Sequence, residues 1–215
     1  MMKNHADKVV NMGFTSERFP VGTHMCYVYN DDSEHRKITA QYINAGLEEN
    51  EFVGYFADLD SSDLVDSYLR EIGVLIPEDR ERENILFEQA KKIYCPNNNV
   101  FDPKTLIGKF KDLHQNCCSS GFKRLRATGE MSWALAPEVE GSTHLAEYES
   151  RLNILFETHP YTAICQYDAR KFDGETIFEI LKVHPMMVVK GQVVHNPHYV
   201  DPREYLMGKG LSPES

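Results

Sequence analysis

The sequence has 215 residues, of which 41% are hydrophobic and 26% are charged, values that are ordinary for a globular domain with a sizeable core. Its 33 acidic residues outnumber the 23 Lys and Arg, which gives a formal net charge of −10. The few basic clusters, such as Lys123 to Arg126, form no stripe. This balance argues against direct nucleic-acid binding, which depends on clustered cations.

The cysteines and the apolar runs of the sequence indicate in which cellular compartment the protein is expected. Five cysteines are present, and two of them, Cys117 and Cys118, are adjacent. An odd count without a regular framework argues against a secreted disulfide scaffold. The N-terminus has no apolar core typical of a signal peptide, and no run approaches the roughly 18 apolar residues of a membrane span. We therefore expect a cytoplasmic protein with reduced thiols and no membrane segment.

Strand and helix patterns alternate along most of the chain. Strands are predicted at 24–30, 51–57, 83–90, 123–131 and 161–168, helices at 31–50, 60–73, 103–121, 142–160 and 173–185, and a final strand or hairpin at 186–197. Such alternation implies right-handed βαβ units. The predicted class is therefore α/β, with three layers: a mainly parallel sheet and helices on both of its faces.

In an open parallel sheet, ligands bind beyond the carboxyl ends of the strands. At the first such junction, "YNDDSEHRK", a nucleotide-binding loop would require the pattern GxxxxGK[ST], whose glycines expose backbone N–H groups. The segment lacks this pattern, and Asp31, Asp32 and Glu34 would repel a phosphate at close range. The sequence therefore argues strongly against phosphoryl transfer through a P-loop.

His24 and Cys26 alternate with Met25, so both project from the same face of the first predicted strand. An imidazole beside a thiol can bind a soft or borderline metal, form a reactive thiolate–imidazolium pair or hold a small polar ligand. Two ligands alone make a weak metal motif, which Cys165 and His184 on or beside later strands could complete. The alternative is that Cys26 is a small core residue and His24 a satisfied histidine.

The stretch "LRATGEMSWAL" brings Arg126, Glu130 and the single tryptophan, Trp133, to the end of a predicted strand. A carboxylate there can accept a hydrogen bond from a ligand, and an indole can wall an apolar pocket. The alternative is that Glu130 pairs with Arg126 or caps the next segment, with Trp133 in the core.

In the predicted helix 142–160, "EYESRLN" places Glu147 and Arg151 on one face and Glu149 and Asn153 on another. An i,i+4 pair such as Glu147–Arg151 is typically solvated and contributes roughly 0.2–0.5 kcal/mol. No GxSxG, HExxH or CxxC motif occurs in the sequence. We therefore expect a binding protein and not an enzyme.

The sequence resembles the MEDS family, the sensory domain named for methanogens, methylotrophs and the regulator of dichloromethane metabolism. The resemblance rests on several blocks in the right order: "FPVGTHMCYVYNDDSE", "GLEENEFVGYF", "LRATGEMSWAL", "YESRLN", "ICQYDARKF", "LKVHP" and "NPHYVDPREYL". It spans residues 19–206 as one sensory domain. Residues 1–18 are then an N-terminal tail or short helix, and residues 207–215 a C-terminal tail.

The resemblance implies a RecA/KaiC-like core without a Walker A loop. It also implies sensing of simple hydrocarbon derivatives, such as C1 or methylated compounds, in prokaryotic signal transduction. The family's His-x-Cys signature matches His24 and Cys26, and its acidic "GEM" block matches Glu130.

The expected ligand-binding residues follow from these observations together: His24, Cys26, Glu130, Trp133, Arg126, Glu149, Arg151, Cys165 and His184. No cofactor is expected; the alternative is a metal- or redox-dependent sensor or enzyme that uses His24 and Cys26. The expected partners are a small-molecule ligand and a signalling protein, either a histidine kinase or a transcription regulator, with a homodimer as a further assembly.

Overall fold

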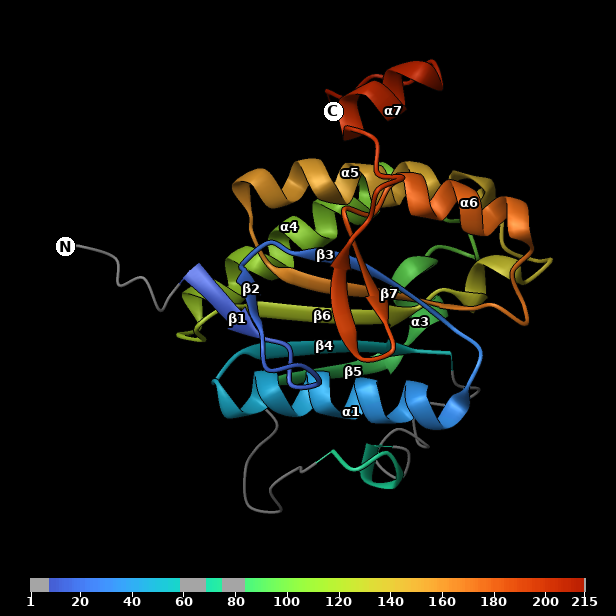
Figure 1. Cartoon of the computed structure of the whole chain (residues 1–215). Helices are drawn as coiled ribbons and strands as arrows, with labels where there is room; N and C mark the ends of the chain where they lie inside the picture. The colour runs from blue at the N-terminus through green and yellow to red at the C-terminus, as the bar shows by residue number, and fades with distance from the viewer. Residues whose placement is uncertain (1–7, 59–68, 75–83, 215) are drawn as a thin grey trace.

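A seven-stranded sheet forms the middle layer of the structure (Figure 1), a computed structural model that describes residues 8–58, 69–74 and 84–214. The strands lie in the order β5-β4-β6-β7-β3-β8-β9. Their bounds are Ile85–Gln89 (β5), Phe52–Ala57 (β4), Leu125–Glu130 (β6), Thr162–Asp168 (β7), His24–Tyr29 (β3), Met186–Val189 (β8) and Gln192–His195 (β9). All neighbouring strands are parallel except β8 and β9, which pair as an antiparallel hairpin.

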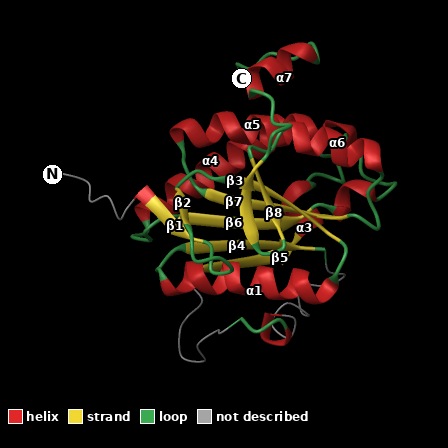
Figure 2. Ribbon diagram, viewed as in Figure 1, coloured by secondary structure: helices red, strands yellow, loops and turns green. Residues whose placement is uncertain are grey.

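Helices cover both faces of this sheet (Figures 1 and 2). One face carries α1 (Asp32–Glu48), and the other carries α4 (Pro103–Ser119), α5 (Leu145–Thr158) and α6 (Gly174–Lys182). Shorter helical segments are α3 (Ala90–Tyr94), α7 (Pro202–Gly208), η3 (Ser132–Leu135) and η4 (Ser142–His144). The predicted three-layer α/β class is confirmed. Within the described ranges, no helix has the length and apolar character needed to cross a membrane.

The central strands divide their side chains between two cores. Met25 of β3 and Ile164 of β7 pack in the cluster that includes Ile38 of α1. Cys26 and Cys165 belong to the opposite cluster, which contains the buried residues of α4 and α5. Because successive side chains of a strand point to opposite faces, this division is the one expected for strands buried on both sides.

Acidic side chains close the junction between β3 and α1. The Oδ1 atom of Asp31 accepts a hydrogen bond from the backbone N–H of Glu34 at 2.7 Å and so caps α1. Nη2 of Arg170 donates to Asp32 at 2.6 Å and to Asp168 at 2.8 Å. Asp31 therefore occupies the helix N-terminus at which a P-loop would bind phosphate.

The N-terminal segment differs from the predicted tail or short helix. β1 (Val9–Asn11) and β2 (Arg18–Pro20) form an antiparallel pair, and Val10 and Met12 are fully buried. Each of these strands has only three residues, too few for a recognisable alternating pattern. Residues 1–7, and residues 60–68 of the predicted helix 60–73, lie outside the described residues.

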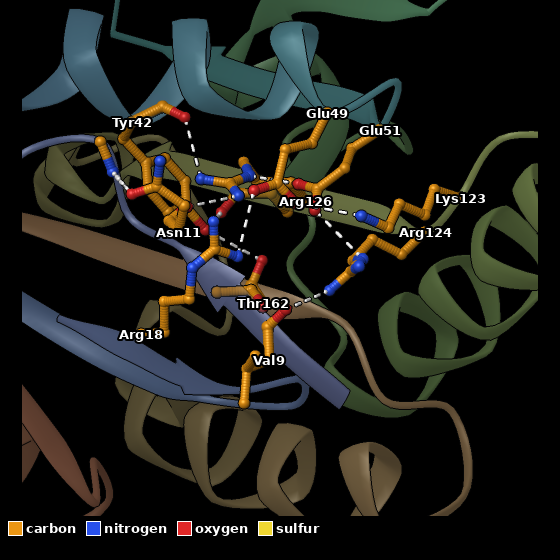
Figure 3. A network of polar contacts seen from close by, with 12 residues as sticks. Val9, Asn11, Arg18, Tyr42, Glu49, Glu51, Lys123, Arg124, Arg126 and Thr162 are labelled. Atoms are coloured by element: carbon orange, nitrogen blue, oxygen red, sulfur yellow. Dashed lines mark hydrogen bonds and ion pairs between the residues drawn. The ribbon is translucent and has the colours of Figure 1, made fainter. Parts of the chain in front are cut away.

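Two buried arginines fasten this β1–β2 hairpin to the amino end of the sheet (Figure 3). Arg126 of β6 donates from Nη2 to the carbonyl oxygen of Asn11 at 2.8 Å, and its Nε donates to the carboxylate of Glu51. Arg124 donates to the carbonyl oxygen of Val9 at 3.1 Å and also lies 3.1 Å from Glu51. Arg126 and Glu51 are both fully buried, so the charge of each depends on the other for compensation.

Replacing Arg126 by Met tests this dependence. The variant leaves the buried Glu51 carboxylate with one cationic partner fewer, and we expect a loss of about 3–5 kcal/mol in the free energy of unfolding. Urea denaturation followed by circular dichroism measures it. The control is Lys123→Met, which removes a partly exposed ion pair with Glu49 and should cost less than about 1 kcal/mol. Equal losses in the two variants would contradict the argument.

Candidate functional site

Four side chains from separate segments meet between the sheet and α5. His24 begins β3, Cys165 lies in β7, Glu149 projects from α5, and His184 follows α6. All four are buried, Cys165 being 4% exposed and the others 0%. One nitrogen, oxygen or sulfur atom from each lies within 4.8 Å of those of the others. We call this set the buried centre.

The register between β3 and β7 brings three polar side chains to one face. Cys26 pairs with Cys165 and His24 with Ala163 in the parallel ladder. Because side chains alternate along each strand, His24, Cys26 and Cys165 project together towards the layer that contains α5. The predicted common face of His24 and Cys26 is therefore observed, and Cys165 joins it from the neighbouring strand.

Glu149 is the hub of the buried centre. Its Oε2 atom lies 3.2 Å from Nε2 of His24, 3.2 Å from Sγ of Cys165 and 3.5 Å from Nε2 of His184. Its other oxygen, Oε1, accepts a hydrogen bond of 2.6 Å from the hydroxyl of Tyr167. One carboxylate thus connects two strands, one helix and the segment that enters β8.

The Nδ1 atom of each imidazole ring, which faces away from Glu149, has a hydrogen-bond partner. Nδ1 of His24 lies 3.0 Å from Oδ1 of Asn153, whose amide group donates to the carbonyl oxygens of Glu149 and Val183. Nδ1 of His184 lies 2.8 Å from the carbonyl oxygen of Ile180. Since each partner is a hydrogen-bond acceptor, each Nδ1 carries a proton, and each Nε2 is directed to the buried centre.

Burial dominates the titration of these groups. It lowers the pKa of His24, and the neighbouring His184 lowers it further. Burial raises the pKa of the Cys165 thiol well above its usual range, and it raises the pKa of Cys26 to about 12. For Glu149, burial raises the carboxyl pKa, but the charge and hydrogen bonds of His184 and His24 in their protonated forms outweigh that effect, and the net direction is downward. Burial therefore favours neutral thiols and a neutral His24, while a proton on either ring favours the ionised form of Glu149.

A pocket of about 580 Å³ lies at the carboxyl ends of β4, β5 and β6. Trp133 lines it and stacks on Tyr94 with ring centroids 4.9 Å apart. The buried indole N–H of Trp133 has no hydrogen-bond acceptor among the described residues. The remaining lining residues are Ala57, Asp58, Gln89, Lys91, Ser132, Leu135, Ala136, Glu138 and Lys171. We call this the strand-end pocket.

Glu130 lies next to the strand-end pocket but is not among its lining residues. Its carboxylate accepts hydrogen bonds from the hydroxyl of Tyr55 and, at 3.1 Å, from the backbone N–H of Asp58. Nζ of Lys171 lies 3.4 Å from Asp58 Oδ2 and also 3.4 Å from the hydroxyl of Ser132. Glu130 is therefore joined to the pocket lining through the backbone N–H of Asp58.

The remaining predicted site residues lie apart from both groups. Arg126 is bound to Glu51 at the amino end of the sheet and does not pair with Glu130. Arg151 donates to Glu147 at 2.8 Å, and its side chain is only 4% exposed, so the pair is not the solvated surface pair that its spacing suggests.

Tyr167 and Lys171 are the participants that sequence reasoning missed. Tyr167 lies two residues after Cys165 on β7, so strand alternation was an available signal for placing its hydroxyl on the same face. Lys171 follows β7 in a turn, where no periodic pattern points its side chain at the strand-end pocket. The carbonyl group of Ile180 carries no sequence signal at all.

Comparison with known proteins identifies the family of this chain. The profile of the sensory domain described as "MEthanogen/methylotroph, DcmR Sensory domain" (MEDS) matches residues 23–185. The chain belongs to the MEDS family. The match includes all four residues of the buried centre, as well as Trp133 of the strand-end pocket and Glu130 beside it.

A curated relative of this MEDS chain is the transcriptional repressor DcmR of Methylorubrum extorquens, which is 23% identical over 162 residues. The aligned region covers 75% of this chain and 57% of the repressor, so the chain corresponds to a little over half of that protein. The MEDS assignment and this relative support a sensory or signalling role.

Solved structures confirm the RecA/KaiC-like core. The KaiC-like protein PH0186 from Pyrococcus horikoshii superimposes with a TM-score of 0.55 at 17% identity, over 79% of this chain and 72% of that protein. The protein PH0321 from the same organism gives a TM-score of 0.58 at 13% identity, over 81% and 82%. At such identities the likeness concerns the fold alone.

The hydrogen bond from Tyr167 to Glu149 allows a matched test of the buried centre. Tyr167→Phe removes a donor to a buried carboxylate, and we expect a loss of about 1.5–3 kcal/mol in the free energy of unfolding. The control is Tyr161→Phe, because the buried Tyr161 hydroxyl has no hydrogen-bond partner among the described residues. Urea denaturation should show almost no change for the control. Indistinguishable midpoints for the two variants would refute the assigned hydrogen bond.

Proposed function

We propose that this MEDS domain senses a small organic molecule in the strand-end pocket and relays its presence to a histidine kinase or a transcription regulator. The ligand class is a simple hydrocarbon derivative, such as a C1 or methylated compound. The single observation that carries the proposal is the position of the strand-end pocket at the carboxyl ends of three parallel strands. Ligands of open α/β sheets bind at that edge.

The chemistry of the strand-end pocket suits a small molecule with one polar group. Its volume of about 580 Å³ lies within the range of small-molecule sites. Trp133, Leu135 and Ala136 supply apolar wall, while Lys171 supplies a hydrogen-bond donor.

The P-loop site of a nucleotide-binding RecA-like protein is replaced here by the acidic cap of α1, so the proposed ligand is not a nucleotide. Signalling requires that the ligand bind two conformations with different affinities. Asp58 is the residue whose position we expect to differ between the two conformations. It lines the pocket, contacts Lys171 and donates its backbone N–H to Glu130. We propose binding without turnover, so a ligand recovered after incubation should be chemically unchanged.

Trp133 makes the proposal directly measurable, since it is the only tryptophan in the chain. We expect titration with a panel of methylated amines, alcohols and chloromethanes to change its fluorescence saturably for at least one compound. Free N-acetyltryptophanamide corrects for collisional quenching. Lys171→Met should weaken binding of that compound about tenfold, the equivalent of about 1.4 kcal/mol.

The matched control is Lys104→Met, which removes an exposed lysine of α4 that does not line the strand-end pocket and should leave the affinity unchanged. A flat fluorescence response and an unchanged melting temperature across the panel would reject sensing at this pocket. Equal affinities of the parent and Lys171→Met would reject the role assigned to the lysine.

A further inference from the structure

The buried centre places four electron-pair donors around one point, and the strand-end pocket does not include any of them. From this geometry we propose that His24, Glu149, Cys165 and His184 bind a divalent metal ion of the zinc class. The donors are Nε2 of each imidazole, one carboxylate oxygen and the Cys165 sulfur. This site goes beyond the proposed sensing function, because it is separate from the proposed ligand pocket.

Four of the six separations between donors fit tetrahedral coordination. With bonds of about 2.0–2.1 Å to nitrogen or oxygen and about 2.3 Å to sulfur, neighbouring donors of a tetrahedron lie about 3.3–3.6 Å apart. Oε2 of Glu149 lies 3.2 Å from His24 Nε2 and from Cys165 Sγ, and 3.5 Å from His184 Nε2. The His24 nitrogen and the Cys165 sulfur are also 3.5 Å apart. One ligand atom from each of the four residues lies within 4.8 Å of those of the others, so the shell closes when the wider separations shorten to the tetrahedral values.

More hydrogen-bond acceptors than donors converge in the buried centre, an arrangement that suits a bound cation. Both Nδ1 atoms donate to acceptors, so both Nε2 lone pairs face the Glu149 carboxylate. Nε2 of His184 is buried and forms no hydrogen bond with any described residue. The Cys165 thiol can supply one proton, which is too few for three converging acceptors. Protonating both rings would place two cations side by side, since the His24 and His184 ring centroids are 4.2 Å apart.

The surrounding residues have the arrangement that metal-binding histidines require. A ligating imidazole commonly donates its second nitrogen to an acceptor, which fixes the tautomer and the ring orientation. Asn153 does this for His24, and the Ile180 carbonyl oxygen does it for His184. Tyr167 holds the second oxygen of Glu149 and so turns the first towards the ion.

The donor set selects the ion. Two nitrogens and one sulfur favour zinc and disfavour Mg²⁺ and Ca²⁺, which take oxygen ligands. A divalent ion with one thiolate, one carboxylate and two neutral imidazoles makes a site of zero net charge, which suits complete burial. Four protein donors leave no open position, so the ion would be structural and would join β3, β7, α5 and the entrance to β8.

Elemental analysis and native mass spectrometry of the reduced, freshly purified chain provide the first test. We expect about one equivalent of zinc in the parent and in Cys26→Ser, and less than a tenth of an equivalent in Cys165→Ser. Cys26 is the informative comparison because it is a buried thiol beside the centre but outside the four donors. Cys117→Ser, which changes a distant buried thiol of α4, is the matched control and should keep its zinc.

Cobalt substitution provides a readout that does not depend on how well a variant folds. Parent protein stripped by a chelator and loaded with Co²⁺ should show a sulfur-to-cobalt charge-transfer band, which Cys26→Ser should keep. If the parent contains no zinc and also fails to take up cobalt, the proposal is overturned. A cobalt spectrum without the sulfur band would also overturn it, as would loss of metal from Cys26→Ser with retention in Cys165→Ser. These measurements involve no organic ligand, so their outcome is independent of the strand-end pocket.

Discussion

A carboxylate enclosed between a helix and a sheet is the constraint on which this structure depends. Burying an ion away from water is expensive unless other groups surround it with hydrogen bonds or opposite charge. The neighbours of Glu149 come from β3, β7 and the segment after α6, three places far apart in the sequence. The packing of α5, the register of β3 on β7 and the placement of His184 must therefore all be correct at once.

The two ends of the sheet have different roles. At the amino end, Arg126 and Glu51 form a buried pair that also secures the N-terminal hairpin (Figure 3). The amino end of the sheet is thus covered by a buried ion pair. At the carboxyl end, the first junction is capped by Asp31, and the strand-end pocket opens farther along the same edge. The RecA-like core is thereby kept, with an acidic cap at the helix N-terminus where a P-loop would bind phosphate.

The sequence was sufficient for the class of fold and for part of the buried centre. Alternating strand and helix patterns predicted the three layers, and the spacing of His24 and Cys26 predicted their common face. The sequence could not show which thiol approaches Glu149, because that depends on the register between β3 and β7. Spacing also could not show that Arg151 is buried, since helical periodicity identifies a face and not what packs against it. The hairpin was missed because its strands are too short for a pattern and the side chains that contact its carbonyl oxygens, Arg124 and Arg126, lie far along the sequence.

The position of β3 in the sheet has a consequence for synthesis of the chain. β3 is the first strand of the large sheet to leave the ribosome, yet both of its partners, β7 and β8, come from the last part of the sequence. His24 and Cys165, for instance, are 141 positions apart. Until those partners are made, an apolar strand has two unpaired edges, the condition under which nascent chains associate wrongly. β3 is therefore open to such association until β7 and β8 have been synthesised.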